Sequence, residues 1–437
     1  MNFEILKRNH LKRNIIIGVV VVAIISACVL TFTRAKYRNT QSIPLVNGSI
    51  NYTPYDFKVL AMYQEGDSGY VEIDEMPSSG YVINEEMSYC TIDNANKDPN
   101  AKLYTLSTGE HVIQGLKKNS KCYLYFDEEP SAMSIILSGR TVQTRSFPIT
   151  TSTTLEGTNG MGDIYSASEG DGITYYFAGN PTDNWVYFAG FYWRIIRINS
   201  DGSIRLIYSG LGSPQTTGTE TQIGTSAFNT NYNASYYVGF KYGDSQHGND
   251  TNSTILNVLE NWYSSNLIAY ADQLTNGTGF CGDRNMASGY LWSSDPDSTI
   301  RYAGSERLND NVVPIFECSD NDVYTVRNSG FGNESLEYPI GLITADEVSF
   351  AGMPNSAKQV DNYLYTDQIY WTMTPSSLSV TSYTKWAYVF LVYALKSYSN
   401  PAVFNTTFGV RPVINLRADV QLSGTGTSTD PYQVVGA

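Results

Sequence analysis

The feature that most constrains this chain is an uncharged, apolar run from Ile15 to Thr33. As a helix that rises about 1.5 Å per residue, a run of this length crosses a bilayer core, which is about 30 Å thick. Basic residues flank the run on both sides: Lys7, Arg8, Lys12, Arg13, Arg34, Lys36 and Arg38. The pattern predicts a cytoplasmic tail over residues 1–14, a single-pass transmembrane anchor over residues 15–33 in the cell membrane, and an extracellular body that begins with a linker over residues 34–46.

Two other interpretations of the same segment remain open. Ile25-Ser26-Ala27-Cys28 resembles a bacterial lipobox, in which cleavage before the cysteine leaves an N-terminal cysteine that becomes lipidated. A cleaved secretory signal peptide is the third interpretation. The apolar run continues past Cys28, whereas a mature lipoprotein usually turns polar at once, and we therefore favour the anchor. All three interpretations place the body outside the cytoplasm.

The composition of the body excludes some classes of function. The chain has a formal net charge of −14 although its N-terminal segment is basic, so the body is strongly acidic. An acidic surface repels phosphate backbones, and we expect no nucleic-acid partner. Charged residues make up only 16% of the chain and aromatic residues reach 13%, which is the opposite of the composition of disordered proteins. A folded body of two or three domains is expected from 437 residues.

Residues 47–128 contain short segments in which apolar and polar residues alternate. These segments are YDFKVLAMY, YVEID, YVINEEMSYCTI, AKLYTLST, EHVIQGL and KCYLYFDEE, and clusters of turn residues separate them. Strands at this spacing predict a small Ig-like β-sandwich. Residues 129–172 are rich in Ser, Thr and Gly and show little periodicity, which predicts a linker.

Residues 173–437 predict an α+β domain that is mostly strand. A hairpin is expected from Trp193–Ile198 and Ser203–Tyr208, because Asp201-Gly202 supplies the positive φ angle that a tight turn needs. Further strands are expected at residues 340–343, 370–374, 386–395 and 410–416.

Two helices are expected in the same domain. One follows Ser253 and is indicated by apolar residues at helical spacing: Ile255, Val258, Leu259 and Trp262. The other begins after Thr344, where the sequence Thr-Ala-Asp-Glu forms a capping box.

Four cysteines lie beyond the N-terminal segment: Cys90, Cys122, Cys281 and Cys318. They allow three pairings. We expect the local one, Cys90 with Cys122 and Cys281 with Cys318, in which each bridge contributes about 3 to 4 kcal/mol through loop-closure entropy. The first bridge is expected to join the two sheets of the sandwich. Free buried thiols remain the alternative, and no Cys-x-x-Cys pair indicates a zinc or thioredoxin-type site.

Several motifs of the second domain occur together: FAGFYWRIIRINSDGSIRLIYSG, ENWYSSNL, GFCGDRN, YPIGLITADEVSFAG, YLYTDQIYWTMTP and FGVRPVINL. In combination they resemble a family of bacterial membrane-anchored surface proteins with no established activity, and SYCTIDN with KCYLYFDEE resembles the small sandwich that often precedes this domain. The order of elements also resembles the C-type-lectin-like fold of formylglycine-generating enzymes and of variable ligand-binding proteins from diversity-generating retroelements. The resemblance implies that residues 173–437 adopt that fold and that Arg411 is structural, paired with acidic or carbonyl groups inside the domain.

The sequence offers little for catalysis. Formylglycine-generating enzymes use a reactive cysteine pair late in the domain, and no cysteine follows Cys318. A nucleophilic triad needs a histidine base, and residues 173–437 contain only His247, which we expect to be a solvated loop residue. The other histidines, His10 and His111, lie in other parts of the chain, so no multi-histidine metal site is expected. We therefore expect no catalytic residue and no cofactor.

Two acidic loops have the oxygen-rich composition that hard cations prefer, one with Asp295 and Asp297 and one with Asp320 and Asp322. The calcium-binding motifs of sugar-binding C-type lectins are missing from the chain. A Ca²⁺ ion at Asp320 and Asp322 is therefore the less favoured hypothesis, and ordinary turn residues are the favoured one.

The most informative stretch is Ser376–Thr407. Its centre, from Trp386 to Tyr393, is apolar on both faces and predicts a central buried strand. The flanks SSLSVTSYTK and KSYSNPAVFNTT are dense in Ser, Thr, Tyr and Asn, the composition of antibody ligand-binding loops. The residues that we expect to contact a ligand are Tyr383, Trp386, Tyr398, Asn400 and Asn405.

The favoured function is a membrane-tethered extracellular recognition protein that binds a glycan, a peptide or a partner on another surface, in the manner of an adhesin. A cell-envelope enzyme that acts on glycan or peptide is the alternative. A structural protein that assembles with copies of itself on the cell surface is the third hypothesis.

Overall fold

The structure is a computed structural model that describes residues 57–66, 68–77, 80–92, 96–105, 111–117, 119–145, 147, 164–170, 172–353, 362–393, 396–399 and 401–437. The expected tail, anchor and first linker lie outside these residues. Within them, no helix has the length and apolar character needed to cross a membrane. The described part of the chain is mostly β, with 37% strand and 15% helix. It divides into two compact units: the first ends at Glu128, and the second comprises Glu129–Ala437 together with the short segment Ser78–Gly80.

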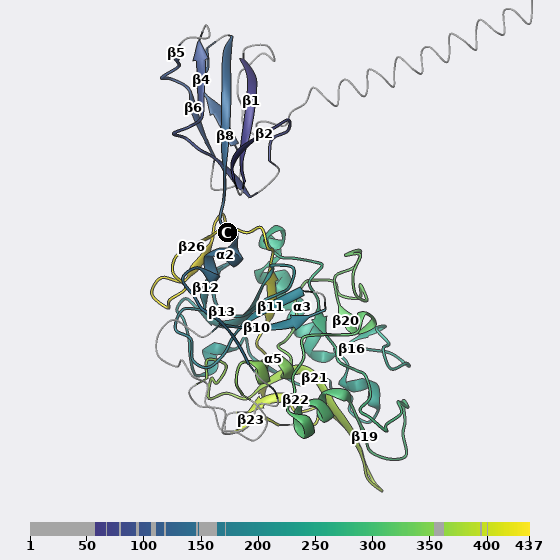
Figure 1. Ribbon diagram of the computed structural model, residues 1–437. Coiled ribbons are helices and arrows are strands. Elements are labelled where there is room, and N and C mark those ends of the chain that lie inside the picture. Colours follow the sequence, from purple (N-terminus) through teal and green to yellow (C-terminus); the bar gives the residue numbers. More distant parts are fainter. Residues whose placement is uncertain are drawn as a thin grey trace, which may run out of the picture. The chain divides into compact units, whose positions relative to one another are not determined.

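The first unit contains one six-stranded sheet and a separate hairpin. The order of the sheet is β2-β1-β8-β4-β5, and β3 also pairs with β8, so that β8 lies between β1 and β4 (Figure 1). The strands are β1 (Phe57–Gly66), β2 (Gly69–Ile73), β3 (Tyr81–Ile83), β4 (Tyr89–Ile92), β5 (Asn96–Lys97) and β8 (Ser120–Glu128). The hairpin joins β6 (Lys102–Thr105) and β7 (His111–Gln114). Alternate residues of β8 are buried, and Cys122, Leu124 and Phe126 form the centre of this core.

Both expected disulfides are present, Cys90–Cys122 and Cys281–Cys318. The expectation that the first one joins two sheets is wrong. Cys90 lies directly opposite Cys122 on the neighbouring strands β4 and β8, so the bridge lies within one sheet. Both side chains are buried, and the bridge is therefore part of the core on one face of the sheet.

The segment expected to be a linker, residues 129–172, contributes regular structure to the second unit. It contains α2 (Ala132–Leu137), β9 (Val142–Thr144) and β10 (Ile164–Glu169). The hydroxyl of Ser131 accepts a hydrogen bond from the Ser134 backbone at the start of α2. Ala132, Ile136 and Ile164 are fully buried in the main core. The apolar face of this short helix, and not its length, explains its place in the fold.

A nine-stranded sheet forms one part of the second unit. Its order is β26-β27-β12-β13-β11-β10-β9, with β14 between β13 and β25. The remaining strands are β11 (Gly172–Phe177), β12 (Trp185–Phe188), β13 (Phe191–Ile198), β14 (Ile204–Leu211), β25 (Val413–Leu416), β26 (Leu422–Ser423) and β27 (Tyr432–Val434). The predicted hairpin is confirmed as β13 and β14, and Gly202 in its turn has a φ of 84°. The pairing of β14 with β25 brings the C-terminal part of the chain beside this hairpin.

A second, six-stranded sheet has the order β15-β24-β21-β22-β23, and β19 pairs with β21. Its strands are β15 (Thr225–Ser226), β19 (Ile300–Arg301), β21 (Tyr370–Val380), β22 (Lys385–Tyr393), β23 (Lys396–Ser399) and β24 (Phe408–Gly409). Figure 1 shows β21, β22 and β23 side by side. The prediction of a central buried strand is confirmed for Val389–Val392 of β22, whereas Trp386 near the start of the strand is 38% exposed.

Both expected helices are present in the second unit. They are α3 (Thr254–Asn266), capped by Ser253, and α5 (Ala345–Phe350), which starts with the predicted capping box of Thr344 and Glu347. The expected strand at residues 340–343 is wrong, because only a single bridge joins Gly341 to Val413. The other short elements are β16 (Lys241–Tyr242), β17 (Thr251–Asn252), β18 (Phe280–Cys281), β20 (Val323–Tyr324), α4 (Ala303–Ser305), η1 (Thr219–Thr221), η2 (Ser235–Val238), η3 (Ile268–Gln273), η4 (Glu306–Asn311) and η5 (Asp320–Asp322).

Candidate functional site

Three aromatic side chains meet at the surface beside β22, in the region where the sequence predicts ligand contact. Trp386 comes from β22, Tyr232 from the segment before η2, and Phe404 from the segment after β23. The ring centroids of Tyr232 and Phe404 are 4.7 Å apart, and those of Trp386 and Phe404 are 5.8 Å apart. Each of the three residues is 38% or 39% exposed. We call these residues the aromatic cluster.

Backbone hydrogen bonds hold the three segments of the aromatic cluster together. The Ala387 N–H donates to the Tyr232 carbonyl at 2.7 Å, and the Val403 N–H donates to the Ala387 carbonyl at 3.0 Å. On the other side, the Asn229 N–H donates to the Val403 carbonyl at 3.1 Å. The two loops therefore add to the edge of a buried strand, which places the rings before any ligand arrives.

The five residues expected to contact a ligand have different positions. Trp386 belongs to the aromatic cluster. Tyr383 stands in the turn between β21 and β22 and is 96% exposed. The side-chain oxygen of Asn405 accepts hydrogen bonds from the backbone and hydroxyl of Thr407, at 3.0 and 2.7 Å, and so shapes its own loop. Asn400 and the side chain of Tyr398 lie outside the described part of the chain.

The sequence reasoning missed two members of the aromatic cluster. Phe404 lies in the polar flank KSYSNPAVFNTT, but it is not one of the tyrosines and asparagines expected to contact a ligand. Tyr232 lies in the segment NTNYNAS, which has the same Asn-, Tyr- and Ser-rich composition as that flank. Composition was the available signal for Tyr232, although it does not show that the two distant segments meet.

A groove opens next to the loop that carries Phe404. Its volume is about 420 Å³, and most of its lining is polar: Thr219, Gln222, Thr225, Asp367, Gln368, Ile369, Tyr393, Thr407 and Phe408. The side-chain oxygen of Gln222 has no hydrogen-bond partner within the described structure. Residues 404–408 thus contribute both to the aromatic cluster and to a groove of hydroxyl, carboxamide and carboxylate groups.

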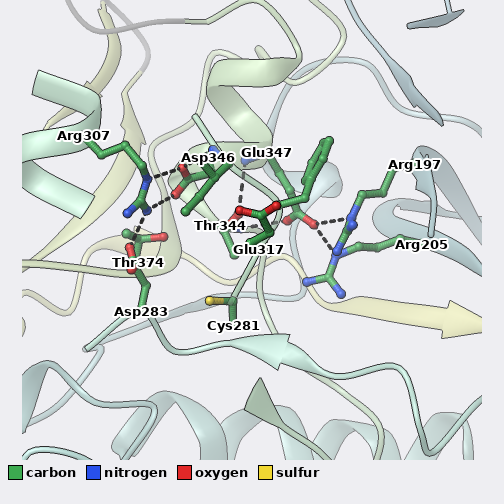
Figure 2. A pocket seen from close by; sticks show the side chains of 12 residues that line it. Arg197, Arg205, Cys281, Asp283, Arg307, Glu317, Thr344, Asp346, Glu347 and Thr374 are labelled. Atoms are coloured by element: carbon green, nitrogen blue, oxygen red, sulfur yellow. Dashed lines mark hydrogen bonds and ion pairs between the residues drawn. The ribbon is translucent and has the colours of Figure 1, made fainter. Parts of the chain in front are cut away.

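A second set of polar residues is enclosed in the second unit, as Figure 2 shows. Glu347 on α5 forms ion pairs with two arginines of the hairpin of β13 and β14, Arg205 at 2.6 Å and Arg197 at 3.1 Å. Arg197 also pairs with Glu169 at 2.6 Å. The other carboxylate oxygen of Glu347 accepts the Thr344 N–H of the capping box at 2.9 Å. This carboxylate is therefore fully engaged by the fold.

The other half of the same region surrounds Arg307. Its guanidinium bonds to Asp346 and Asp283, each at 2.7 Å from the same terminal nitrogen (Figure 2). Burial raises the pKa of Asp283 to about 6. We call the seven residues Glu169, Arg197, Arg205, Asp283, Arg307, Asp346 and Glu347 the buried charge cluster. The cavity at its centre is about 20 Å³, which is space for a single water molecule and not for a substrate.

His247 is not a solvated loop residue, which corrects the expectation. Its Nδ1 atom lies 3.4 Å from Asp322, and only 22% of its side chain is exposed. Asp322 is fully buried and pairs with Arg284 at 2.6 Å. Burial alone would raise the pKa of Asp322, but the adjacent His247 and Arg284 outweigh it and hold that pKa below its usual value.

The loop considered for calcium is organised around this ion pair. Asp320 is exposed, whereas Asp322 points inward to Arg284. Asp295, from the other acidic loop, pairs with Lys385. Among the described residues, no group of three or more His, Cys, Asp or Glu side chains is placed to hold a metal ion.

Arg411 is fully buried beside the hairpin of β13 and β14. Its Nε and one terminal nitrogen donate to the Tyr208 carbonyl at 3.1 and 2.9 Å. The guanidinium also lies over the ring of Tyr370, at 4.8 Å from its centroid. These contacts join β14 to β21, so that Arg411 connects the two sheets of the second unit.

Comparisons of the chain with protein-family models, with curated proteins and with solved structures found no match.

Proposed function

We propose that this chain is a membrane-tethered extracellular recognition protein whose second unit binds a glycan at the aromatic cluster. In this proposal residues 15–33 anchor the chain, the first unit is an Ig-like spacer, and the second unit is a C-type-lectin-like domain. The observation that carries the proposal is the contact of three partly exposed aromatic rings on a hydrogen-bonded backbone.

The exposure of these rings is the first step of the argument. Single aromatic residues at a surface need no explanation, whereas a contiguous apolar patch marks an interaction site. Trp386 and Phe404 could have packed inward, as Trp371 and Phe228 do elsewhere in the same unit. The loops instead hold their rings at the surface, where burial by a ligand would stabilise the complex.

The surroundings of the rings favour a sugar among possible ligands. A pyranose ring has an apolar face of C–H groups, which stacks on aromatic rings, and an edge of hydroxyl groups that need hydrogen-bond partners. The aromatic cluster offers rings for the face. The groove lined by Thr407 and Phe408, which follow Phe404 along the chain, offers Thr219, Gln222 and Asp367 for the hydroxyl groups of further sugar units.

Two further observations support the location and the fold in this proposal. Disulfides persist in oxidising compartments, and two of them are present, one in each unit. The pairing of β14 with β25 and the inward position of Arg411 agree with the role that the C-type-lectin-like resemblance implies for the Gly-Val-Arg-Pro segment.

The test is a screen of the full chain, held in lipid nanodiscs, against immobilised glycans and surface proteins. Trp386→Ala and Phe404→Ala are screened in parallel. Tyr187→Ala is the matched control, because Tyr187 is also 38% exposed and lies on β12 in the other sheet. A glycan bound by the wild type and by the control, but not by the cluster variants, supports the proposal. Binding that all variants retain, or no glycan binding, contradicts it.

A further inference from the structure

A lysine and an asparagine on the hairpin of β16 and β17 form a chain of contacts with a glutamate on α3. Lys241 and Asn252 are direct cross-strand partners. The Nζ atom of Lys241 donates to Oδ1 of Asn252 at 2.7 Å. The Nδ2 atom of Asn252 donates to Oε2 of Glu260 on α3 at 2.8 Å and to Asn257 at 3.1 Å. The carboxamide of Asn252 therefore lies between an amine and a carboxyl group.

The surroundings of Lys241 and Glu260 shift the pKa of each group toward its uncharged form. All three side chains are partly buried. Burial lowers the pKa of Lys241 below its usual value, so the free amine is more accessible than in water. Burial raises the pKa of Glu260, so its carboxyl group holds a proton more readily. An amine of this kind is a nucleophile, and a carboxyl group of this kind is a general acid and base.

The backbone of Lys241 is held firmly at this position. Its N–H donates to the Tyr324 hydroxyl at 3.2 Å, and its carbonyl accepts from that hydroxyl and from Arg284, both at 3.1 Å. The amine is consequently kept against one carboxamide. Its nitrogen is hydrogen-bonded to Oδ1 of Asn252, the oxygen bonded to the carbonyl carbon Cγ. Such placement is what converts a slow encounter into an intramolecular reaction.

We propose that Lys241 and Asn252 become joined by an intramolecular isopeptide bond, with Glu260 as the general acid and base. The unprotonated Nζ attacks Cγ of Asn252, the new C–N bond forms, and the bond from Cγ to Nδ2 breaks. The leaving nitrogen keeps its two hydrogens, receives one proton that Nζ gives up, and departs as ammonia. Glu260, which already contacts Nδ2, carries that proton. The reaction needs no oxidant, reductant or other reactant.

The geometry favours this reaction over an ordinary ion pair. A buried lysine and glutamate that only stabilise the fold would pair directly. Here the carboxamide separates them, and its carbonyl oxygen faces the amine while its nitrogen faces the carboxyl group. That orientation places the amine beside the carboxamide that it would attack and Glu260 on the nitrogen that would leave. The product would tie two strands at positions eleven residues apart, in addition to the disulfides.

The test is mass spectrometry of the full chain, followed by tryptic mapping after reduction and alkylation. Between Arg205 and Arg284 the only site for trypsin is Lys241. The proposal predicts that cleavage after Lys241 is lost and that residues 206–284 appear as one peptide, lighter by one molecule of ammonia. Separate peptides 206–241 and 242–284 would overturn it. A succinimide at Asn252 also loses ammonia but leaves Lys241 cleavable, so the map distinguishes the two.

Two variants identify the roles of the groups. Lys241→Arg keeps the charge and removes the nucleophile, so the loss of ammonia is expected to disappear. Glu260→Gln keeps the shape and the contact to Asn252 and is expected to leave Lys241 cleavable by trypsin, with an unchanged circular dichroism spectrum. A cross-link that persists in Glu260→Gln would overturn the role of Glu260. Loss of ammonia that persists in Lys241→Arg would overturn the bond itself.

Discussion

The buried charge cluster and the aromatic cluster lie in the same unit, and they differ in how fully their groups are satisfied. Every carboxylate of the buried charge cluster has an arginine partner, and Glu347 has two. The rings of Tyr232, Trp386 and Phe404 contact one another, yet each keeps more than a third of its surface exposed to solvent. Charge inside the unit therefore holds elements together, whereas the apolar surface of the aromatic cluster stays partly exposed to solvent.

This contrast assigns the buried charge cluster to stability and leaves the aromatic cluster as the candidate for binding. The ion network around a cavity of about 20 Å³ connects α5, the hairpin of β13 and β14, and η4. Removal of Glu347 would leave the buried Arg205 without an ion-pair partner. We expect smaller side chains in the aromatic cluster to leave the fold intact. Variants of the two regions are expected to have opposite effects on stability and on binding.

The largest expected effect is the loss of stability in Glu347→Ala. The change leaves Arg197 and Arg205 without their shared partner and removes the capping box of α5. We expect the free energy of unfolding of the second unit to fall by about 3 to 5 kcal/mol. Denaturant unfolding followed by tryptophan fluorescence measures this unit alone, because all 6 tryptophans lie in it. The exposed Glu220→Ala is the control, and an equally stable Glu347→Ala would remove the structural role assigned to the buried charge cluster.

The next effect is a dependence of stability on pH through Asp283. The pKa of this carboxyl group is about 6 in the folded protein, above its ordinary value of 3.8. The folded state therefore binds the proton more tightly, and Asp283 makes the unit less stable at neutral pH than at pH 4, by about 2 kcal/mol.

Asp283→Asn is the variant that measures this dependence. Between pH 4 and pH 6 the stability of the wild type is expected to decline relative to that of Asp283→Asn as the pH rises. Unfolding curves at several pH values provide the comparison, with the exposed Asp244→Asn as reference. A difference that stays constant across this pH range would show that Asp283 does not titrate there.

A smaller effect in free energy is expected in the aromatic cluster, and it concerns binding. Trp386→Ala removes a ring that a glycan would cover, and we expect about a tenfold loss of affinity, or 1.4 kcal/mol. The free energy of unfolding is expected to change by less than about 1 kcal/mol, because the ring is partly exposed. Titrations and denaturant curves on the same preparations measure both quantities. A destabilised protein with unchanged affinity would reverse the comparison between the two regions.

The smallest effect is expected at Tyr383. This side chain is almost fully exposed in a turn, and residues at the rim of an interface contribute little to affinity. We expect Tyr383→Ala to weaken binding by less than about threefold. The same titration checks this value. A loss as large as that of Trp386→Ala would move the centre of the site from the aromatic cluster to the turn.

Local signals in the sequence predicted the local parts of the fold. The turn Asp201-Gly202 indicated the hairpin of β13 and β14, and the capping box at Thr344 indicated the start of α5. The helix α2 was missed because it has only six residues, and its stability comes from burial against distant parts of the second unit. The first disulfide was placed between sheets, since the sequence does not show which strands are neighbours.

The candidate site was predicted only in part for the same reason. Polar composition indicated the flanks of β22, and Trp386 directly follows one of them, but Tyr232 reaches the same place from a segment far away in the chain. Arg197 and Arg205 were not predicted for the same reason. They are direct cross-strand partners in the hairpin of β13 and β14, and the sequence does not show that Glu347 on α5 packs against both of them.

The most direct test of the central claim compares the affinity of the full chain for the glycan selected in the screen with that of Trp386→Ala/Phe404→Ala. Tyr187→Ala serves as the control for an exposed aromatic residue outside the aromatic cluster. The account predicts a loss of at least about a hundredfold in the double variant, with unfolding curves and control affinity unchanged. Equal affinity in the wild type and the double variant would contradict it.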